Sequence, residues 1–404
     1  MKRKADLLTL VTELKDQMLE KKDFVIPSRF LSMVDGKIVV KTGKEQNNAL
    51  NDMLKGSGIS FTQEQQEVLQ LQLLEIAHQQ FCEKLGIPKT YFEKMLAGHI
   101  GLLDHNVSYW FTNAQKNFLL RTFINPKENK GVLRALLADR FLLLDNYDVL
   151  MTALEGIKES GIKIDIESCD LTDKRMYVRF IAPDIEIQAP ELLKHYRVPG
   201  GSPNEGKTGI MTGFVLSNSE VGHGQFSISP RCVIHACTNG MIFKDDAFSR
   251  VHIGKRMDEY TNISWSEETK QKNLQLIMSQ VKDAVKAFIR PEFIGSKIQE
   301  LTLKGAKPLQ HPTDTVKNIC QELALSEDKE NAILNYFVRG GDTNVFGAAQ
   351  ALTFFAHKDA DADQQYEFEK LATEVVQDVK EYDKPHIASR SKKTNQLNMG
   401  LSNQ

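Results

Sequence analysis

Apolar residues recur with a helical period in some stretches of the chain and alternate with polar residues in others. Near the start, helical spacing predicts an amphipathic helix whose apolar face holds Leu7, Leu10, Val11, Leu14 and Met18. Farther on, the tight-turn pair Asp35-Gly36 precedes the strand-like stretch KIVVK, which predicts a β-hairpin over residues 24–42. Residues 44–60 are polar and rich in Gly and Asn, as is typical of a loop.

A helical pattern covers residues 62–96. Thr62 and Gln65 have the spacing of a capping box, and Gly86 followed by Pro88 marks the end of the helix. A second helix is expected next, and a third around the stretch NVSYWFTNAQKNFLLRTF. The N-terminal region is therefore predicted to be mostly helical, with one small hairpin.

A period of two returns in the middle of the chain. IKIDIES and RMYVRFIA alternate apolar and polar residues, and IMTGFVLSN, QFSISPRCVIHACT, MIF and SRVHIGKR are predicted as further strands. Asn239-Gly240 is a strong hairpin signal between two of them. Because strands joined by short turns pair in space, this stretch predicts an antiparallel meander.

A long helix is expected after the meander, from a capping box of Ser264 and Glu267 to Pro291. Its apolar face is formed by Leu274, Ile277, Met278, Val281, Val285, Phe288 and Ile289. Residues 313–382 have helical patterns, and Phe346, Phe354 and Phe355 suit a small helical core there. The end of the chain is polar and basic and is expected to be disordered.

Together these patterns predict an α+β protein: an antiparallel β-meander core packed by a long helix, with mostly helical N- and C-terminal regions. The expected parts are a helical N-terminal region with a hairpin, an α+β core, a helical C-terminal domain and a basic tail. Their expected bounds are residues 1–125, 126–295, 296–382 and 383–404.

Composition narrows the class of protein. The 404 residues are 41% hydrophobic and 26% charged, with a net charge of −2, so a polyanionic partner must be met by a local patch. No apolar run approaches the roughly 20 residues of a membrane span, and the charges in MKRKADLLTLVTELKDQMLEKK argue against a signal peptide. The five cysteines are scattered and odd in number, which indicates a reducing compartment. We expect a cytoplasmic protein without a membrane partner.

Residues 201–208, GSPNEGKT, fit the phosphate-binding P-loop template. A working P-loop stands between a buried strand and a helix. Here PELLKHYRVPG precedes it and the strand-like GIMTGFVLSN follows it, so we expect a chance match and no cofactor. If the loop does bind phosphate, Gly206, Lys207 and Thr208 are the expected contacts.

The meander also gathers His and Cys residues, as a zinc site would require. Strand alternation separates them, however, because Cys232 points to the face opposite His235 and Cys237. The remaining candidates are His223 and His252, and the meander contains no Cys-x-x-C pair. No metal is therefore expected. Asp139, Asp145 and Asp148 are expected to gather around the start of a helix, where the helix dipole and capping explain acidic residues just as easily as a site does, and no catalytic triad motif is present.

The same alternation predicts a polar face on one strand. Phe226, Ile228 and Cys232 face the core, whereas Ser227, Ser229, Arg231 and His235 face away from it. Hydroxyls, amides and cations on one sheet face are groups that contact phosphate and sugar, although such a face also suits plain exposure to water. The candidate nucleic-acid-binding residues are Arg231, Lys244, Arg250, Lys255, Arg256, Asn218, Asn239 and Ser229.

Four stretches of the chain resemble a phage- and plasmid-associated family of unknown function, number nine-three-two. They are AHQQFCEKLGIPKTYFEKML, VLRALLADRFLLLDNYDVL, GFVLSNSEVGHGQFSISPRCVIHACTNGMI and NVFGAAQALTFFAH, and they fall between about residues 60 and 360. The third is the most specific, with Asn218-Ser219-Glu220-Val221-Gly222 and Cys237-Thr238-Asn239-Gly240-Met241. The resemblance implies that the gene is carried on a mobile element, but it does not imply any particular reaction. It also implies that the loop GSPNEGKT is a variable part of the family.

The sequence favours a non-enzymatic protein that binds or anneals single-stranded DNA in the DNA metabolism or recombination of a phage, prophage or plasmid. Phage annealing proteins also carry a meander followed by a long helix, which is an analogy of fold alone. Two alternatives stay open: a nucleotide- or metal-dependent enzyme, and a host-interaction protein that does not bind nucleic acid. A homo-oligomer is compatible with the sequence, which does not determine the oligomeric state.

Overall fold

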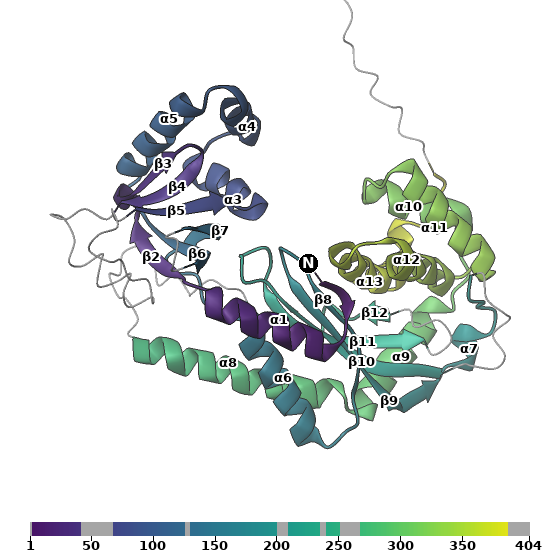
Figure 1. Ribbon diagram of the computed structural model, residues 1–404. Coiled ribbons are helices and arrows are strands. Elements are labelled where there is room, and N and C mark those ends of the chain that lie inside the picture. Colours follow the sequence, from purple (N-terminus) through teal and green to yellow (C-terminus); the bar gives the residue numbers. More distant parts are fainter. Residues whose placement is uncertain are drawn as a thin grey trace, which may run out of the picture.

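The computed structural model describes residues 2–41, 68–125, 130–199, 209–234, 240–250 and 267–386. These residues form an α+β structure with two sheets, which confirms the predicted fold class. In Figure 1 an N-terminal lobe and a C-terminal helical domain stand on either side of the larger, central sheet. We define the N-terminal lobe as the described residues between 24 and 138 and the C-terminal helical domain as residues 291–382.

The N-terminal lobe is built on a six-stranded sheet in the order β2-β6-β7-β5-β4-β3, in which only β5 and β7 pair in parallel. Helices α3, α4 and α5 pack on it through a core that includes Phe81, Phe111 and Leu120. The strands are β2 (Phe24–Pro27), β3 (Leu31–Val34), β4 (Lys37–Lys41), β5 (Val68–Leu73), β6 (Asn117–Asn125) and β7 (Lys130–Ala138). The helices are η1 (Ser28–Phe30), α3 (Glu75–Leu85), α4 (Lys89–Gly98) and α5 (Ile100–Asn113).

This lobe contains more strand than the single hairpin that the sequence predicts. The hairpin itself is confirmed, with Asp35 and Gly36 at φ +50° and +70° between β3 and β4. The predicted helix over 62–96 is wrong in part, because Val68–Leu73 is a strand; α3 ends as expected at Gly86. The predicted third helix ends at Asn113, and its remainder is strand β6. Strand β5 pairs with β4, and β6 pairs with β2, so both strands depend on partners far away in the sequence, although β6 also forms a hairpin with the adjacent β7. Thr62 and Gln65 lie outside the described residues.

The central sheet confirms the predicted meander. Its order is β1-β8-β9-β10-β11-β12, so the strands from β8 to β12 are neighbours in chain order, while β13 pairs with β11. Strand β10 begins at Gly209, directly after the P-loop-like stretch, as expected. The strands are β1 (Lys2–Ala5), β8 (Asp165–Leu171), β9 (Met176–Gln188), β10 (Gly209–Asn218), β11 (Phe226–Ile234), β12 (Gly240–Ile242) and β13 (Phe248–Arg250).

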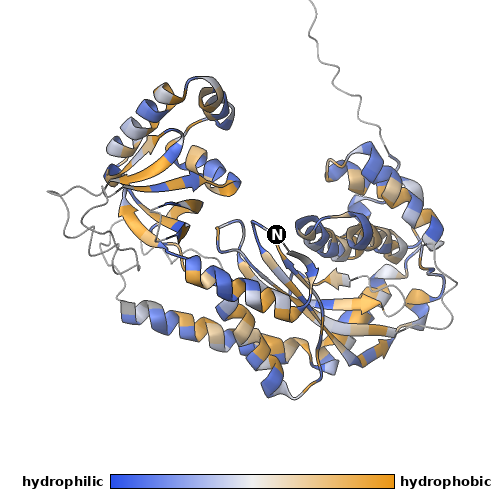
Figure 2. Ribbon diagram, viewed as in Figure 1, coloured by the Kyte–Doolittle hydropathy of each residue, from blue (hydrophilic) through white to orange (hydrophobic). Residues whose placement is uncertain are grey.

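Helices cover both faces of the central sheet. On one face, Phe180, Phe214 and Phe226 pack with residues of α1 (Leu7–Glu20), α6 (Asn146–Ser160) and α8 (Glu267–Phe288), so the predicted long helix is confirmed. On the other face, α13 (Ala362–Gln377) lies against the sheet, and its Tyr366 packs with Tyr177. Figure 2 shows the apolar residues along the strands of this sheet.

The C-terminal helical domain forms a third core. Its central helix α12 is buried along most of its length, and Phe346, Phe354 and Phe355 are buried as predicted. Short helix α7 (Pro190–Leu193) also contributes to this core. The other helices are α9 (Pro291–Gly305), α10 (Pro312–Glu322), α11 (Glu327–Gly340), α12 (Val345–Asp359), α13 and η2 (Val379–Glu381).

Helix α1 is amphipathic as predicted. Leu10 and Leu14 are buried, whereas Met18 is 42% exposed and lies outside the apolar face. Within the described ranges, none of the helices is long and apolar enough to span a bilayer.

Candidate functional site

Arg231 does not face solvent, so the prediction that this face of β11 is polar and exposed is wrong. Its guanidinium is fully buried and pairs with Glu167 and with Glu369, where Nη2 and Oε1 lie 3.0 Å apart. Ser227 and Ser229 on the same face are buried as well. The reason is that α13 covers this face of the sheet, and α13 lies more than 130 residues farther along the chain.

A buried charge network joins the sheet to α13. Glu369 accepts hydrogen bonds from Arg231 and from Arg179 Nε, the latter at 3.3 Å, and Arg179 Nη1 pairs with Asp170 at 2.8 Å. Burial alone would raise the pKa of Glu369, but the two arginines outweigh it and hold the pKa below its usual value. Arg231 therefore has a structural role and is not available to phosphate.

Asn218 also has a structural role. It is fully buried, and its Nδ2 donates to the carbonyl oxygen of Leu144 at 2.8 Å and to Asn146 Oδ1 at 2.9 Å. Both acceptors lie at the start of α6. Asn218 therefore fixes the end of β10 to α6 and cannot reach a ligand.

Glu220, two residues on, ties the N-terminal lobe to the central sheet. Its carboxylate pairs with Lys21 at 2.6 Å and with Arg134 at 2.7 Å, and it accepts from the Asn146 backbone N–H at 2.8 Å. Burial raises the pKa of Glu220, yet the cations Lys21, Arg134 and Arg121 lower it overall to about 2. The stretch from Asn218 to Gly222, the most specific part of the family resemblance, thus lies at the junction between the N-terminal lobe and the central sheet.

The remaining predicted residues have mixed outcomes. Ser229 and Lys244 line a cleft that is described below. Arg250 lies in β13, where only its backbone is described. Asn239, Lys255, Arg256 and the loop residues Gly206, Lys207 and Thr208 lie outside the described residues.

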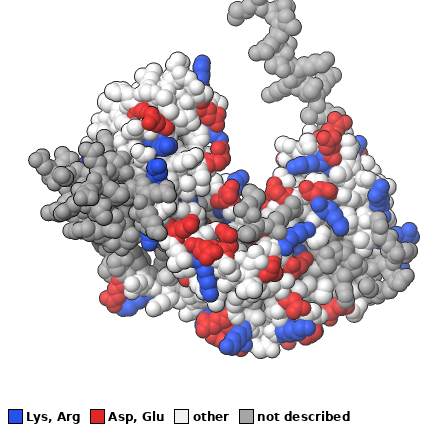
Figure 3. Space-filling model, viewed as in Figure 1, with Lys and Arg blue, Asp and Glu red and all other residues white. Residues whose placement is uncertain are grey.

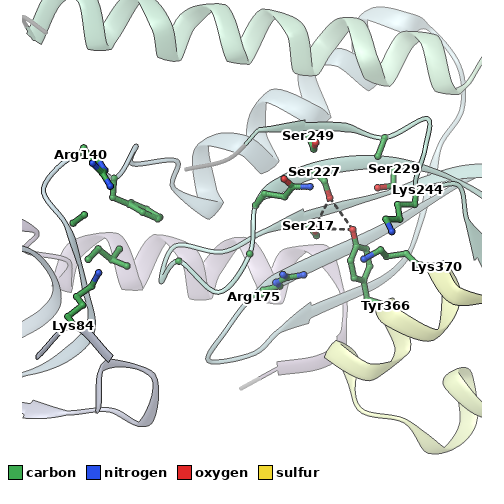
Figure 4. Close-up of a pocket in the computed structure, with 17 residues that line it drawn as sticks. Lys84, Arg140, Arg175, Ser217, Ser227, Ser229, Lys244, Ser249, Tyr366 and Lys370 are labelled. Carbon is green, nitrogen blue, oxygen red and sulfur yellow. Dashed lines mark hydrogen bonds between the residues drawn. The ribbon is translucent and has the colours of Figure 1, made fainter. Parts of the chain in front are cut away.

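The cleft has a volume of about 670 Å³ and lies where the N-terminal lobe, the central sheet and α13 meet. Figure 3 shows the molecule hollowed between its two sides. In Figure 4, Lys84 and Arg140 lie at one side of the cleft, and Lys244 and Lys370 lie at the other. Its polar lining consists of Lys84, Arg140, Arg175, Lys244 and Lys370 with Ser217, Ser227, Ser229, Ser249, Gln225 and Tyr366.

Charge in this cleft has one sign. Five cations line it, and no Asp or Glu is among its lining residues, although the whole chain has a net charge of −2. Among the described residues, no carboxylate forms an ion pair with Lys84 or Arg140. Burial lowers the pKa of Lys84; Glu83 raises it, and the nearby cations Lys116 and Arg140 lower it further, so that the pKa is lowered overall. A bound anion would relieve this repulsion.

Three of the cations have carboxylate partners near the rim. Lys370 and Arg175 lie 2.9 and 3.8 Å from Glu367, and Lys244 lies 2.9 Å from Glu374. The Glu367 and Glu374 side chains are 59% and 39% exposed, and exposed pairs of this kind contribute only about 0–1 kcal/mol. These lysines and this arginine can therefore exchange a carboxylate for a phosphate at little cost.

Hydroxyl groups line the sheet side of the cleft. Ser227 Oγ lies 3.0 Å from both Ser217 Oγ and Tyr366 Oη, which links adjacent strands to α13 (Figure 4). Lys370 Nζ lies 5.0 Å from the centre of the Tyr366 ring. The two serines and Tyr366 are buried and bond to one another, so they order this wall of the cleft beside Lys370.

Arg175 is held in place by the turn that joins β10 and β11. Its Nε donates to the carbonyl oxygen of His223 at 2.6 Å. Gly224 has φ +136°, and a Cβ at this position would collide with the guanidinium of Arg175. The turn Gly222-His223-Gly224 therefore positions Arg175 at the cleft.

The predicted metal and acidic candidates have other roles where they are described. Cys232 lies in the hydrophobic core, and burial raises the pKa of its thiol to about 12. Asp145 pairs with Arg121 at 2.6 Å and Lys21 at 3.3 Å, beside the start of α6. Within the described part of the chain, no three His, Cys, Asp or Glu side chains gather as a metal site; His235, Cys237 and His252 lie outside it.

The fold and the cleft define an α+β protein with a cation-lined cleft where the N-terminal lobe, the central sheet and α13 meet. No family model, no curated protein and no solved structure matches this chain. Function must therefore be inferred from the cleft and its side chains.

Proposed function

We propose that the cleft binds single-stranded DNA and that the protein acts without catalysis, as a binding or annealing factor in the DNA metabolism of a mobile element. The observation that carries the proposal is the charge of the lining: five cations beside hydroxyl groups and no carboxylate. Each phosphate of a strand carries a negative charge, and proteins bind single strands mainly by neutralising it in a cationic groove. The mobile-element context rests on the family resemblance, and the cytoplasmic location on the scattered cysteines.

A single strand fits this cleft better than a duplex does. The lining comes from α3, the end of β7 and the residues after it, from the central sheet and from α13, so a ligand must enter between three walls. Duplex DNA is stiff, with a persistence length of about 50 nm, whereas a single strand bends easily between closely spaced walls. The volume of about 670 Å³ accommodates a short piece of a strand.

The alternative of a P-loop enzyme receives less support. In that motif the helix after the loop turns its N-terminal N–H groups toward the phosphates. Here the residues after the loop form β10, a strand that is paired on both sides. A helix N-terminus is thus missing at the place where the motif requires it.

A direct binding assay tests the proposal. Fluorescein-labelled single-stranded DNA, the matching duplex and the matching single-stranded RNA are titrated with full-length protein at low salt, with fluorescence polarisation as the readout. We expect the single-stranded DNA to bind more tightly than the duplex and the variant Arg140→Glu to weaken binding at least tenfold. Equal affinity of Arg140→Glu and wild-type protein, or no binding of single-stranded DNA at low salt, would contradict the proposal. Tighter binding of RNA than of DNA would show that the ligand is single-stranded RNA.

A further inference from the structure

A second pocket, of about 310 Å³, adjoins the cationic cleft. Its walls come from β9, the turn between β10 and β11, the segment between α10 and α11, and α13. Much of the lining is apolar: the ring of Tyr177 with Leu323, Leu325, Phe368 and Leu371. Unlike the cleft, this pocket therefore offers a surface for a flat, uncharged group.

The two pockets share a wall. Arg175 lines both, and the turn contributes Gly222 and Gly224 to the cleft but His223 to the second pocket. Helix α13 likewise presents Lys370 to the cleft and Leu371 to the second pocket. One ligand can therefore occupy both pockets if it has a charged part and an apolar part next to each other.

The charge of the second pocket differs from that of the cleft. Lys174, Arg175 and Lys329 are accompanied by the carboxylates Asp363 and Glu367. Burial lowers the pKa of His223, and Lys174 and Arg175 lower it further, so its imidazole is neutral at pH 7. The lining of the cleft contains no carboxylate, although Glu367 and Glu374 pair with three of its cations at the rim. Phosphate is thus drawn to the cleft, and the second pocket suits an uncharged ring.

Asp363 has a fixed orientation in this pocket. Its Oδ1 accepts from Tyr177 Oη at 2.7 Å and from Thr172 Oγ1 at 3.5 Å. Burial and the neighbouring Asp363 raise the pKa of Tyr177, so the phenol stays protonated and continues to donate. No hydrogen bond from a described residue reaches Oδ2, which leaves this oxygen free to accept from a ligand.

We propose that the second pocket holds one nucleobase of the strand whose phosphates lie in the cleft, and that Asp363 favours bases with an exocyclic amino group. This inference rests on the proposed function. Carboxylates accept from the N4 amino group of cytosine, and adenine and guanine carry amino groups too. Thymine has no amino group. Its N3–H lies between two carbonyl oxygens, which a carboxylate repels. Tyr177, Phe368 and the leucines supply the apolar surface that a base prefers to water.

The test compares four fluorescein-labelled strands of equal length on full-length protein: oligo-dC, oligo-dA, oligo-dT and an abasic strand with the same phosphates. We expect oligo-dC and oligo-dA to bind about fivefold more tightly than oligo-dT, and the abasic strand to bind most weakly. The variant Asp363→Asn should remove the preference over oligo-dT, because its amide still accepts from Tyr177 but offers the ligand a donor. Lys84→Ala, the matched control in the cleft, should weaken all four strands equally and keep the order.

The outcomes separate this inference from the proposed function. Equal affinity for the abasic strand and oligo-dC would overturn the base pocket and leave the cationic cleft intact. The base pocket would also be wrong if Asp363→Asn kept the wild-type preference, in which case the apolar lining would fit a protein partner better. Failure of all four strands to bind at low salt would overturn both proposals. The comparison of the four strands on wild-type protein does not depend on the correct folding of any variant.

Discussion

Glu369 of α13 and Arg231 of β11 form an ion pair in the interior of the protein, with Oε1 and Nη2 3.0 Å apart and both side chains almost fully buried. The pair joins the C-terminal helical domain to the central sheet. It also explains why a residue that looks like a phosphate ligand in the sequence is a structural element. A buried charge that loses its partner is strongly destabilising, which gives the pair a measurable role.

The first prediction concerns this pair. Glu369→Ala leaves Arg179 and Arg231 buried without their shared partner and should lower the free energy of unfolding by about 3–5 kcal/mol in urea denaturation. Glu374→Ala, on the same helix, removes only the exposed partner of Lys244 and should cost less than about 1 kcal/mol. Similar losses for the two variants would contradict the assigned role of Glu369.

The second prediction concerns the space around Arg231. A Cβ at Gly240 would collide with the Arg231 guanidinium, so Gly240→Ala should destabilise the protein by about 1–3 kcal/mol. Gly101 in α5 has nothing within 4 Å of such a Cβ, so Gly101→Ala should be neutral or stabilise by up to about 1 kcal/mol. Thermal unfolding of both variants is the measurement. A stable Gly240→Ala protein would show that Arg231 does not pass so close to this strand.

The third prediction concerns pH. The pKa of Glu220 is lowered to about 2 in the folded protein, from 4.5, so its stabilising contribution is complete above pH 4.5 and is lost as the pH falls toward 2. A difference of this size corresponds to roughly 3 kcal/mol. Glu220→Gln should therefore lower stability at pH 7 and flatten its pH dependence between pH 4.5 and 2. Urea denaturation across this pH range is the measurement.

Glu75 provides the control for Glu220. It pairs with Lys89 on the surface of the N-terminal lobe, where solvent weakens the interaction. Glu75→Gln should leave the pH dependence close to that of the wild-type protein. If both variants lost the same pH dependence, the buried junction at Glu220 would have no special part in holding the lobes together.

The fourth prediction concerns the P-loop-like stretch. Because a strand follows it, Lys207→Ala should not change binding of single-stranded DNA at any salt concentration, and neither the wild-type protein nor this variant should release phosphate from ATP. Malachite-green phosphate release and polarisation assays on the two proteins are the measurements. ATP turnover that disappears with Lys207→Ala would establish the enzyme alternative instead.

The order of strands β8 to β12 could be predicted from local signals, because alternation marks each strand and neighbours in the sequence are neighbours in the sheet. Such signals do not predict the edge strand β1 or the pairing of β13 with β11, and Gly240 of the predicted Asn239-Gly240 turn belongs to β12. Strands β5 and β6 are not predicted by the helical pattern, because each pairs with a strand far away in the sequence, β5 with β4 and β6 with β2. The alternation of Leu69 and Leu71 in VLQLQL was the signal that could have revealed β5.

The cleft could not be predicted in the same way. Of its five cations only Lys244 is among the candidate nucleic-acid-binding residues, together with Ser229 among the hydroxyls. Lys84, Arg140, Arg175 and Lys370 come from distant segments that meet only in the folded chain. Arg231 is a candidate in the sequence but is not part of the cleft. Strand alternation predicts the face on which its side chain lies, but not which other element covers that face.

The salt dependence of binding tests the cationic cleft most directly. Log K for a labelled single strand should fall linearly with log salt concentration, with a slope of up to roughly −3.5 if all five cations contact phosphate. Lys84→Ala and Arg140→Ala should each reduce the slope by about 0.7, and the double variant by about twice that. Lys272→Ala, which removes an exposed lysine of α8 outside the cleft lining, should leave the slope unchanged. Slopes that are the same for wild type, the two cleft variants and Lys272→Ala would show that single-stranded DNA, if bound, lies elsewhere.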